Sequence, residues 1–245
     1  MHHDLAQQTA LVTGATAGIG RATAQALAAR GADIIVHGRN EQRAADTLQR
    51  IEVLGAKARF EPADLSDPAQ VTALADRVGE VDILVNNAGI FHFARTVDTT
   101  PAIFDAHIDI NLRAPYLLVQ ALAPGMTERG HGAIINVSSG AADSPGLGSG
   151  IYGATKAALE SLTRVWAAEY GPAGVRVNAV AAGPTRTEGT AAYGDAFESA
   201  GQAVALQRLA HPEEIAGAIA FMASADAGYV NGATLGAMGG QPALG

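Results

Sequence analysis

The chain has 245 residues, a formal net charge of −8, and 48% hydrophobic against 16% charged side chains. This balance excludes a disordered chain, and the lack of a basic patch or run argues against nucleic acid as a partner. The sequence has no cysteine, which excludes disulfides, thiolate zinc sites and a thiol nucleophile. No apolar run resembles a signal peptide or reaches the ~18 residues of a membrane span, so we expect a soluble, cytoplasmic protein without a membrane partner.

Apolar runs of strand length alternate with amphipathic runs of helix length. In chain order we expect a strand at 9–13, a helix at 19–30, a strand at 33–37, a helix at 41–54, a strand at 57–61, a helix at 68–78, a strand at 81–85, a helix at 106–129, a strand at 133–137, a helix at 152–170, a strand at 175–180, a helix at 212–223 and a strand at 233–237. Strands that are apolar on both faces and separated by helices indicate a parallel sheet covered on both sides. We therefore predict a single α/β domain over residues 1–245, a Rossmann-type doubly wound parallel sheet of about seven strands.

The segment 183–211 is the longest one without a clear periodicity. A loop of this length in a compact domain is usually functional, so we expect a substrate lid around residues 186–210. In a doubly wound sheet the ligand binds at the carboxyl ends of the strands.

A glycine-rich turn follows the first predicted strand and leads directly into a helix. It reads TGATAGIG over residues 13–20, with Gly14, Gly18 and Gly20 in the spacing G-x-x-x-G-x-G. Glycines let a backbone turn tightly and approach a pyrophosphate, which the N–H groups of the helix N-terminus can bind. The alternative is a turn that needs glycine only for packing.

Several motifs occur in one order along the chain: TGATAGIG at 13–20, NNAG at 86–89, Asn111, Ser139, YGATK at 152–156 and the segment 183–187. Together they resemble the short-chain dehydrogenases and reductases of the classical type, over nearly the whole chain. In pattern the sequence is most similar to the 3-oxoacyl-carrier-protein reductase-like and tropinone-reductase-like members. The resemblance implies hydride transfer between a nicotinamide dinucleotide and a carbonyl or alcohol, and a homotetramer built through the helices predicted at 106–129 and 152–170.

The end of the second strand favours NADP(H) over NAD(H). An acid about 20 residues after the glycines would bind the ribose 2′-hydroxyl, but here Gly38 and Arg39 stand at this place. Arginine is a planar donor that suits a 2′-phosphate. Against this, Ala17 stands where many NADP-preferring relatives have a basic residue, and Arg39 could be an ordinary exposed side chain. An NAD-dependent alcohol dehydrogenase of the same family remains the alternative.

The resemblance implies further cofactor contacts along the chain. Asp64 would contact the adenine, although a turn or a helix N-cap explains this residue equally well. Asn86 is expected to be structural. The Gly183 turn departs from the family, which usually has Pro-Gly where this chain has Ala182-Gly183. The complete expected cofactor set is Gly14, Thr16, Gly18, Ile19, Gly20, Arg39, Asp64, Leu65, Asn87, Ala88, Gly89, Tyr152, Lys156, Gly183, Thr185 and Thr187.

Tyr152 and Lys156 form the candidate catalytic pair, because residues four apart share one face of a helix. A free phenol has a pKa of about 10, and a nearby ammonium is expected to lower it toward the range of efficient acid–base catalysis. Ser139, thirteen positions before Tyr152, would donate a hydrogen bond to the substrate oxygen. Its neighbour Ser138 should face the other way. By resemblance, Asn111 interrupts a helix and holds water behind the lysine.

The ordinary explanation of such a pair is a lysine stem lying over an aromatic ring. A non-catalytic dinucleotide sensor would fit that explanation, but such a protein could have lost Tyr152 or Lys156, and both are present.

Phe91, Phe93, Tyr193 and Phe197 are expected to border a largely apolar substrate site, with core or subunit packing as the alternative for each. The partner would be a small carbonyl or alcohol, and a phosphopantetheine-bearing protein stays open. Met238 stands where many relatives have an acid, in a region expected to pack between subunits. Without HExxH or a similar compact set, we expect no metal.

Overall fold

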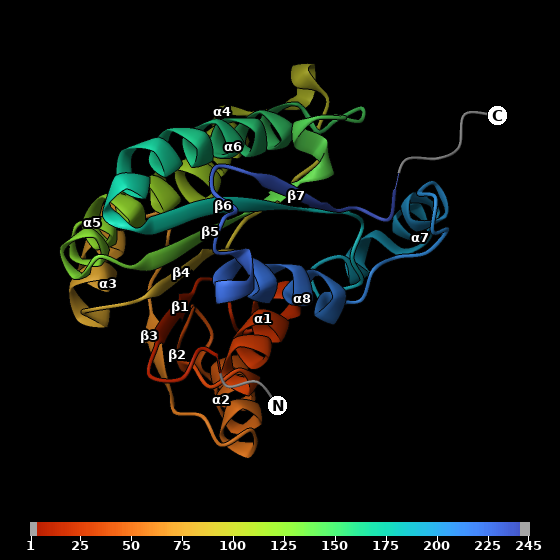
Figure 1. The fold of residues 1–245 in the computed structure, drawn as a ribbon. Helices are drawn as coiled ribbons and strands as arrows, with labels where there is room; N and C mark the ends of the chain where they lie inside the picture. Colours follow the sequence, from red (N-terminus) through yellow and green to blue (C-terminus); the bar gives the residue numbers. More distant parts are fainter. Residues whose placement is uncertain (1–3, 241–245) are drawn as a thin grey trace.

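The computed structural model describes residues 4–240, which contain one seven-stranded sheet with all strands parallel. Across the sheet the order is β3-β2-β1-β4-β5-β6-β7 (Figure 1). This arrangement confirms the predicted doubly wound α/β fold. The strands are β1 (Thr9–Val12), β2 (Asp33–Gly38), β3 (Ala58–Pro62), β4 (Ile83–Asn86), β5 (Gly132–Ser139), β6 (Val175–Ala182) and β7 (Thr234–Ala237).

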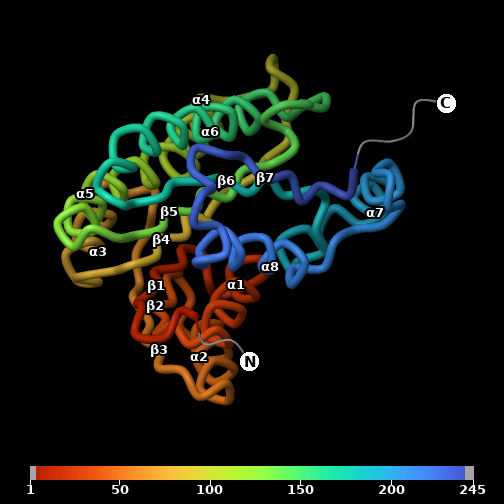
Figure 2. The backbone as a smooth tube through the Cα atoms, in the orientation of Figure 1, coloured from red at the N-terminus to blue at the C-terminus, as the bar shows by residue number. Residues whose placement is uncertain are grey.

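Helices cover both faces of this sheet. They are α1 (Gly18–Ala29), α2 (Glu41–Val53), α3 (Pro68–Val78), α4 (Pro101–Ile108), α5 (Ala114–Arg129), α6 (Gly150–Tyr170), α7 (Gly194–Gln202) and α8 (Pro212–Ala223). α1, α2 and α8 lie on one face, and α3, α5 and α6 lie on the other (Figures 1 and 2). α7 stands apart from both layers, beyond the end of β6 (Figure 1).

The strands supply a separate core on each face, because successive side chains of a strand point in opposite directions. In β1, Ala10 and Val12 pack with α1 and α8, whereas Leu11 packs with α3 and α5. Ile34 and Ile35 of β2 divide in the same way. These apolar residues are fully buried on both sides, which fixes the register and holds the carboxyl ends of the strands in place.

The order of the strands reverses at β1, since β2 pairs with one of its edges and β4 with the other. At such a point the connections leave toward opposite faces and open a crevice at the carboxyl ends of the strands. The glycine-rich turn begins here, directly after Val12.

The single helix predicted at 106–129 is wrong. The structure has α4, then a π-helical turn η2 (Asp109–Arg113), then α5. The π turn contains Asn111, whose buried side chain hydrogen-bonds outside the helix, so the interruption expected by resemblance is present. Pro115 lies in the first turn of α5, where its missing N–H costs little, and Pro124 lies inside that helix.

The patternless segment 183–211 contains structure that the sequence did not indicate. A 3₁₀ turn η5 (Ala191–Tyr193) leads into α7. This helix has nine residues and includes Gly194 and Gly201, which weaken helical propensity and hide the pattern. The other predicted elements differ from the observed ones by at most two residues at either end. Among residues 4–240 no helix is both long enough and apolar enough to cross a membrane.

Candidate active site

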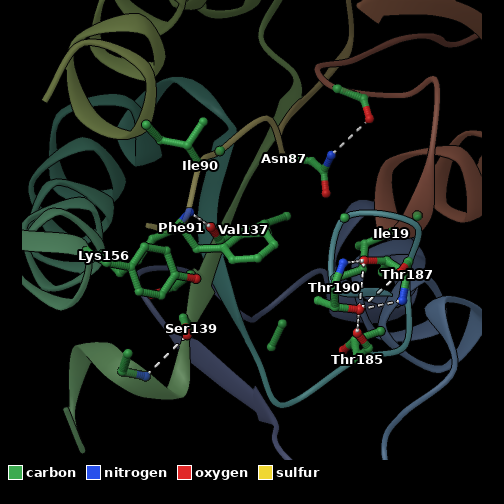
Figure 3. A pocket seen from close by; sticks show the side chains of 18 of the residues that line it. Ile19, Asn87, Ile90, Phe91, Val137, Ser139, Lys156, Thr185, Thr187 and Thr190 are labelled. Carbon is green, nitrogen blue, oxygen red and sulfur yellow. Dashed lines mark hydrogen bonds between the residues drawn. The ribbon is translucent and has the colours of Figure 1, made fainter. Parts of the chain in front are cut away.

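A cavity of about 890 Å³ lies at the carboxyl ends of the strands. That volume lies in the range of ligand and cofactor sites. Figure 3 shows Ser139, Lys156 and Phe91 toward one end, and Thr185, Thr187 and Thr190 across from them. Of the residues predicted from the sequence, those that line the cavity are Gly14, Thr16, Gly18, Ile19, Gly20, Arg39, Asp64, Leu65, Asn87, Ala88, Gly89, Phe91, Phe93, Ser139, Tyr152, Lys156, Gly183, Thr185, Thr187 and Phe197. Asn111 and Tyr193 are not part of this lining.

The glycine loop is shaped by close backbone approaches. Gly14 has a φ of +66°, and a Cβ at Gly20 would collide with the Gly14 carbonyl oxygen and lie 2.5 Å from Nδ2 of Asn87. That amide donates to the Thr13 carbonyl at 2.8 Å. Ala17, the N-cap of α1, provides no side-chain cap. The start of α1 is therefore not capped by its own N-cap residue, and its first N–H groups can bind an anion, as a pyrophosphate site requires.

A carboxylate of the predicted lid already lies at this helix terminus. Glu188 Oε2 accepts from the Gly18 N–H at 3.0 Å, and Oε1 is 2.9 Å from Nη1 of Arg21. Burial raises the pKa of the Glu188 carboxyl. Backbone hydrogen bonds and the Arg21 charge together lower it by more than burial raises it, so the pKa lies below its usual value. An anion is thus favoured at the start of α1.

His37, at the end of β2, was not recognised from the sequence. Its Nδ1 accepts from the Gly14 N–H at 3.2 Å, and its Nε2 lies 3.2 Å from the Ala63 carbonyl oxygen. Burial lowers the pKa of the ring to about 4. The neutral imidazole joins β2 to the glycine loop and to the turn after β3. The signal for this role was a polar residue inside the apolar run DIIVH.

Arg39 and Asp64 lie at the far end of the cavity. The Arg39 side chain is 69% exposed, and its Nη1 is 4.0 Å from Oδ2 of Asp64. Asp64 Oδ1 accepts from the backbone N–H and the hydroxyl of Ser66, which lower the pKa of the carboxyl. Asp64 is therefore a turn residue that also lines the cavity, and the N-cap of α3 is Asp67.

Position 38 cannot hold an acid without rearrangement. A Cβ at Gly38 would lie 2.5 Å from Cγ2 of Thr16, in the glycine loop. The carboxylate that would bind a ribose 2′-hydroxyl is thus absent at a position where the packing itself favours glycine.

Three polar side chains meet at the other end. Ser139 ends β5, and Tyr152 and Lys156 lie one turn apart in α6. The Lys156 ammonium donates to the Val137 carbonyl at 2.8 Å and lies 5.9 Å from the centre of the Tyr152 ring. Burial lowers the pKa of Lys156 to about 8.

The expected fall in the Tyr152 pKa is not found in the ligand-free protein. Burial raises the pKa of the phenol, and a hydrogen bond with Ser139 only partly offsets this. The prediction assumed an ammonium directed at the phenol oxygen, but Lys156 is held by the carbonyl of Val137. Tyr152 is therefore a protonated phenol at neutral pH.

The two serines diverge as the strand geometry predicts. Ser138 Oγ donates to Glu160 at 2.6 Å, whereas Ser139 Oγ accepts from the Ala141 N–H at 3.2 Å and bonds with Tyr152. The thirteen-residue spacing thus selected the serine beside Tyr152.

Asn111 lies behind this group. Its amide exchanges two hydrogen bonds with the Ile90 backbone, at 2.8 and 2.9 Å, and donates to Thr155 Oγ1 at 3.2 Å. Asn86 is structural, as expected, because its amide donates to Asn136 in the interior.

Two phenylalanines pack on Tyr152, and two further aromatic rings extend this cluster. Phe91 and Phe93 lie 6.5 and 5.9 Å from its ring, both edge-on. Tyr193 packs on both phenylalanines, and its hydroxyl donates to the Phe91 carbonyl at 3.0 Å. Phe197 packs on Tyr193 and lines the cavity. Three of the four predicted substrate residues therefore border the cavity, and Tyr193 supports two of them from outside.

The comparisons with known proteins agree with this geometry. A family model described as enoyl-(acyl carrier protein) reductase matches residues 14–241. Human dehydrogenase/reductase SDR family member 4 is 38% identical over 248 residues, covering 97% of this chain and 88% of the human protein. The chain belongs to the short-chain dehydrogenase/reductase family.

Solved structures of this family superpose closely. A short chain dehydrogenase/reductase family protein is 49% identical with a TM-score of 0.91, covering 97% of this chain and 98% of that one. A gluconate 5-dehydrogenase from Burkholderia cenocepacia, solved in complex with NADP and tartrate, is 36% identical with a TM-score of 0.90, covering 97% and 96%. The protein is thus a short-chain dehydrogenase/reductase with a family relative that binds NADP.

One departure from the family pattern lies inside the site. Met238, which stands where many relatives have an acid, lines the cavity. A Cβ at Gly183 would lie 2.7 Å from the Met238 Cα, so the two segments touch at their backbones. The Gly183 N–H also donates to the Ala237 carbonyl at 2.9 Å. This contact stiffens the turn that lacks the usual proline. Among residues 4–240, no three His, Asp or Glu side chains gather as metal ligands.

Proposed function

We propose that this short-chain dehydrogenase/reductase is an NADP(H)-dependent enzyme that transfers hydride between the nicotinamide and a carbonyl or secondary alcohol. The observation that carries the proposal is the meeting of Ser139, Tyr152 and Lys156 at the end of a cavity that begins at the glycine loop. A non-catalytic sensor would need the loop but not this buried, hydrogen-bonded group.

The dinucleotide fits the cavity. Gly14, Gly18 and Gly20 provide close backbone approach, and the start of α1, where Glu188 accepts from the Gly18 N–H, would provide donors for the pyrophosphate. The bound dinucleotide supplies the hydride. Lys156 would hold the nicotinamide ribose, and Thr185 and Thr187 would hold the carboxamide end.

The preference for NADP(H) rests on charge. Arg39 and Arg43 line the adenosine end, and packing of Gly38 against Thr16 leaves no place for a ribose-binding acid. A guanidinium suits a 2′-phosphate. The gluconate 5-dehydrogenase that resembles this chain contains NADP, which supports the same preference.

Tyr152 serves as the general acid in reduction. Its phenol has a raised pKa, so it carries a proton at neutral pH and can donate it to the carbonyl oxygen. Ser139 donates a hydrogen bond to the same oxygen as negative charge develops there. In oxidation the phenol must first lose its proton, which burial opposes, so oxidation should need a higher pH than reduction.

The experiment measures oxidation of NADPH and NADH with ketones and 3-oxoacyl thioesters, for the wild type and for Tyr152→Phe. We expect turnover with NADPH that is lost in the variant. Arg39→Asp should shift selectivity toward NADH, while the control Arg50→Asp, an exposed residue of α2 outside the cavity, should not. An unchanged NADPH/NADH ratio in Arg39→Asp would overturn the cofactor assignment, and turnover retained by Tyr152→Phe would overturn the catalytic one.

We also propose a homotetramer. Phe104, Tyr116 and Val165 are each nearly half exposed on α4, α5 and α6, beside a hollow that Leu112 and Leu162 help to line. Large apolar side chains grouped in this way are typical of a contact surface. Light scattering should give four times the 24.9 kDa of one chain, and a monomer would contradict the proposal.

A further inference from the structure

We infer that the substrate is a neutral carbonyl compound with an aromatic ring next to the carbonyl, and that Phe91 and Phe93 select it. This inference rests on the proposed function, because it takes the Tyr152 hydroxyl as the place of reaction. It goes further by choosing among ketones, sugar acids and acyl carriers.

The ring geometry supports an aromatic group. Phe91 and Phe93 stand edge-on to Tyr152, with ring centres 6.5 and 5.9 Å from it, and they lie 6.3 Å from one another. Both line the cavity. A carbonyl held at Tyr152 would therefore bring its neighbouring group against two phenyl rings. Aromatic pairs in edge-on or offset contact attract one another beyond the burial of their area.

The charges at this end disfavour an anionic substrate. The cations among the described residues that line the cavity are Arg39, Arg43 and Lys156, apart from the largely neutral His37. Arg39 follows β2, three strand spacings or roughly 14 Å from β5, and Lys156 is buried against the Val137 carbonyl. The other charged lining residue near Ser139 is Asp143, which would repel a carboxylate.

The hydrogen-bonding groups point to one oxygen. Ser139 and Tyr152 are two hydroxyls joined to each other, and together they suit one carbonyl oxygen. Asp143, Ser144 and Ser149 also line the cavity. A sugar acid would still bring hydroxyls against Phe91 and Phe93, whose rings offer them no hydrogen bond.

The predicted lid holds the selecting rings in place. The Tyr193 hydroxyl donates to the Phe91 carbonyl, and its ring lies 5.8 and 5.9 Å from those of Phe91 and Phe93. Tyr193 does not line the cavity, so it acts as a positioning residue. Phe197 of α7 extends the apolar wall.

The test uses three carbonyl compounds of contrasting chemistry with NADPH: acetophenone, cyclohexyl methyl ketone and a keto-gluconate. Small 2,3-butanedione serves as a reference that presents no aromatic ring to Phe91 and Phe93. We expect kcat/KM for acetophenone to exceed that for cyclohexyl methyl ketone at least fivefold, and that for the keto-gluconate at least a hundredfold. A keto-gluconate preferred over acetophenone would overturn the inference, as would equal rates for the two ketones.

Variants of the two phenylalanines test whether their rings select the aromatic substrate. Phe91→Leu and Phe93→Leu should each raise KM for acetophenone about tenfold, and should lower kcat/KM for acetophenone more than kcat/KM for 2,3-butanedione. The control Phe221→Leu, a partly exposed ring of α8 outside the cavity, should change neither. Tyr193→Phe keeps the ring and loses the hydroxyl, so it should raise KM for acetophenone with little change in kcat. Unchanged KM in both phenylalanine variants would overturn the inference.

A binding readout separates this inference from the proposed function. Saturation-transfer NMR detects acetophenone on the enzyme without turnover. Binding of acetophenone by the wild type that weakens in Phe93→Leu would support the inference. If such binding were found and no carbonyl were reduced, the proposed function would be wrong and the inferred binding preference would stand. Equal binding by both proteins would overturn the inference even if NADPH-dependent reduction were observed.

Discussion

The two ends of the cavity are built by different means. The nucleotide end, around the glycine loop, is formed mainly by backbone: by glycines and by the N–H groups at the start of α1. Two side chains support this backbone, the buried His37 and the partly buried Asn87. The substrate end, around Tyr152, is formed mainly by side chains: by aromatic rings from the loop after β4 and from the predicted lid. At the nucleotide end an added side-chain atom on a loop glycine would collide with neighbouring atoms. At the substrate end a lining side chain can be replaced without moving the strands of the sheet. A chain can thus keep one cofactor site and vary its substrate.

The largest expected effect is the loss of kcat when Tyr152, which lies where the two ends of the cavity meet, is replaced. Tyr152→Phe removes the proton donor and keeps the ring that packs on Phe91 and Phe93. General acid catalysis contributes about 10²–10⁴-fold, so kcat should fall by that factor. Steady-state kinetics measure the loss, and fluorescence titration should show NADPH binding within twofold of the wild type. A variant that loses NADPH binding as well would contradict the division between the ends.

His37 tests the support of the nucleotide end. Its pKa in the folded protein, about 4, lies below its usual value of 6.5, so the unfolded chain binds more protons between these values. Stability should therefore fall as the pH is lowered through this window, by about 3 kcal/mol in total. Denaturant unfolding at pH 7 and pH 4 measures this loss, which His37→Asn should lack. Parallel pH profiles for the wild type and the variant would contradict the assignment.

Gly20 tests how closely the nucleotide end is packed. Gly20→Ala places a Cβ against the Gly14 carbonyl and the Asn87 amide, so the loop must shift and NADPH affinity should fall at least tenfold. The control is Gly217→Ala in α8, where a Cβ meets nothing within 4 Å. That change should raise stability by up to ~1 kcal/mol and leave affinity unchanged. Calorimetric titration compares the two variants, and equal affinities would show that the loop yields to an added methyl.

The smallest effect concerns the contact between the lid and the loop. Glu188 occupies the Gly18 N–H and Arg21, which a pyrophosphate would also attract. Glu188→Gln removes the competing charge and should tighten NADPH binding a few-fold. The control Glu198→Gln changes a lid carboxylate paired with Arg186 instead and should have no such effect. Weaker binding in Glu188→Gln would mean that the carboxylate helps to order the site.

The nucleotide end was largely predictable from the sequence. Close backbone approach requires glycine, so the positions of Gly14, Gly18 and Gly20 reveal the loop directly. The spacing from Ser139 to Tyr152 and Lys156 matches that of the family, so the resemblance identified these three residues in advance. His37 escaped because an imidazole buried neutral between a backbone N–H and a carbonyl has no sequence signature of its own.

The substrate end was predictable only in part. Phe91, Phe93 and Phe197 were identified by position, but Tyr193 supports the cavity from outside and Met238 lines it, because lid and strand ends meet only in three dimensions. The short helix α7 was missed because its nine residues include Gly194 and Gly201, which weaken helical propensity. The direction of the Tyr152 pKa shift was wrong, because sequence spacing gives neither the burial of the phenol nor the partner of Lys156.

The most direct test of the central claim follows the hydride itself. A single turnover of acetophenone is run with NADPH deuterated at nicotinamide C4, in separate samples for each of the two C4 positions, and the alcohol is analysed by mass spectrometry. The expected result is one deuterium on the carbinol carbon in one of the two samples and none in the other, with product from Tyr152→Phe forming about 10²–10⁴-fold more slowly. Alcohol without deuterium from either sample, or NADPH binding without product from any carbonyl tested, would contradict the account.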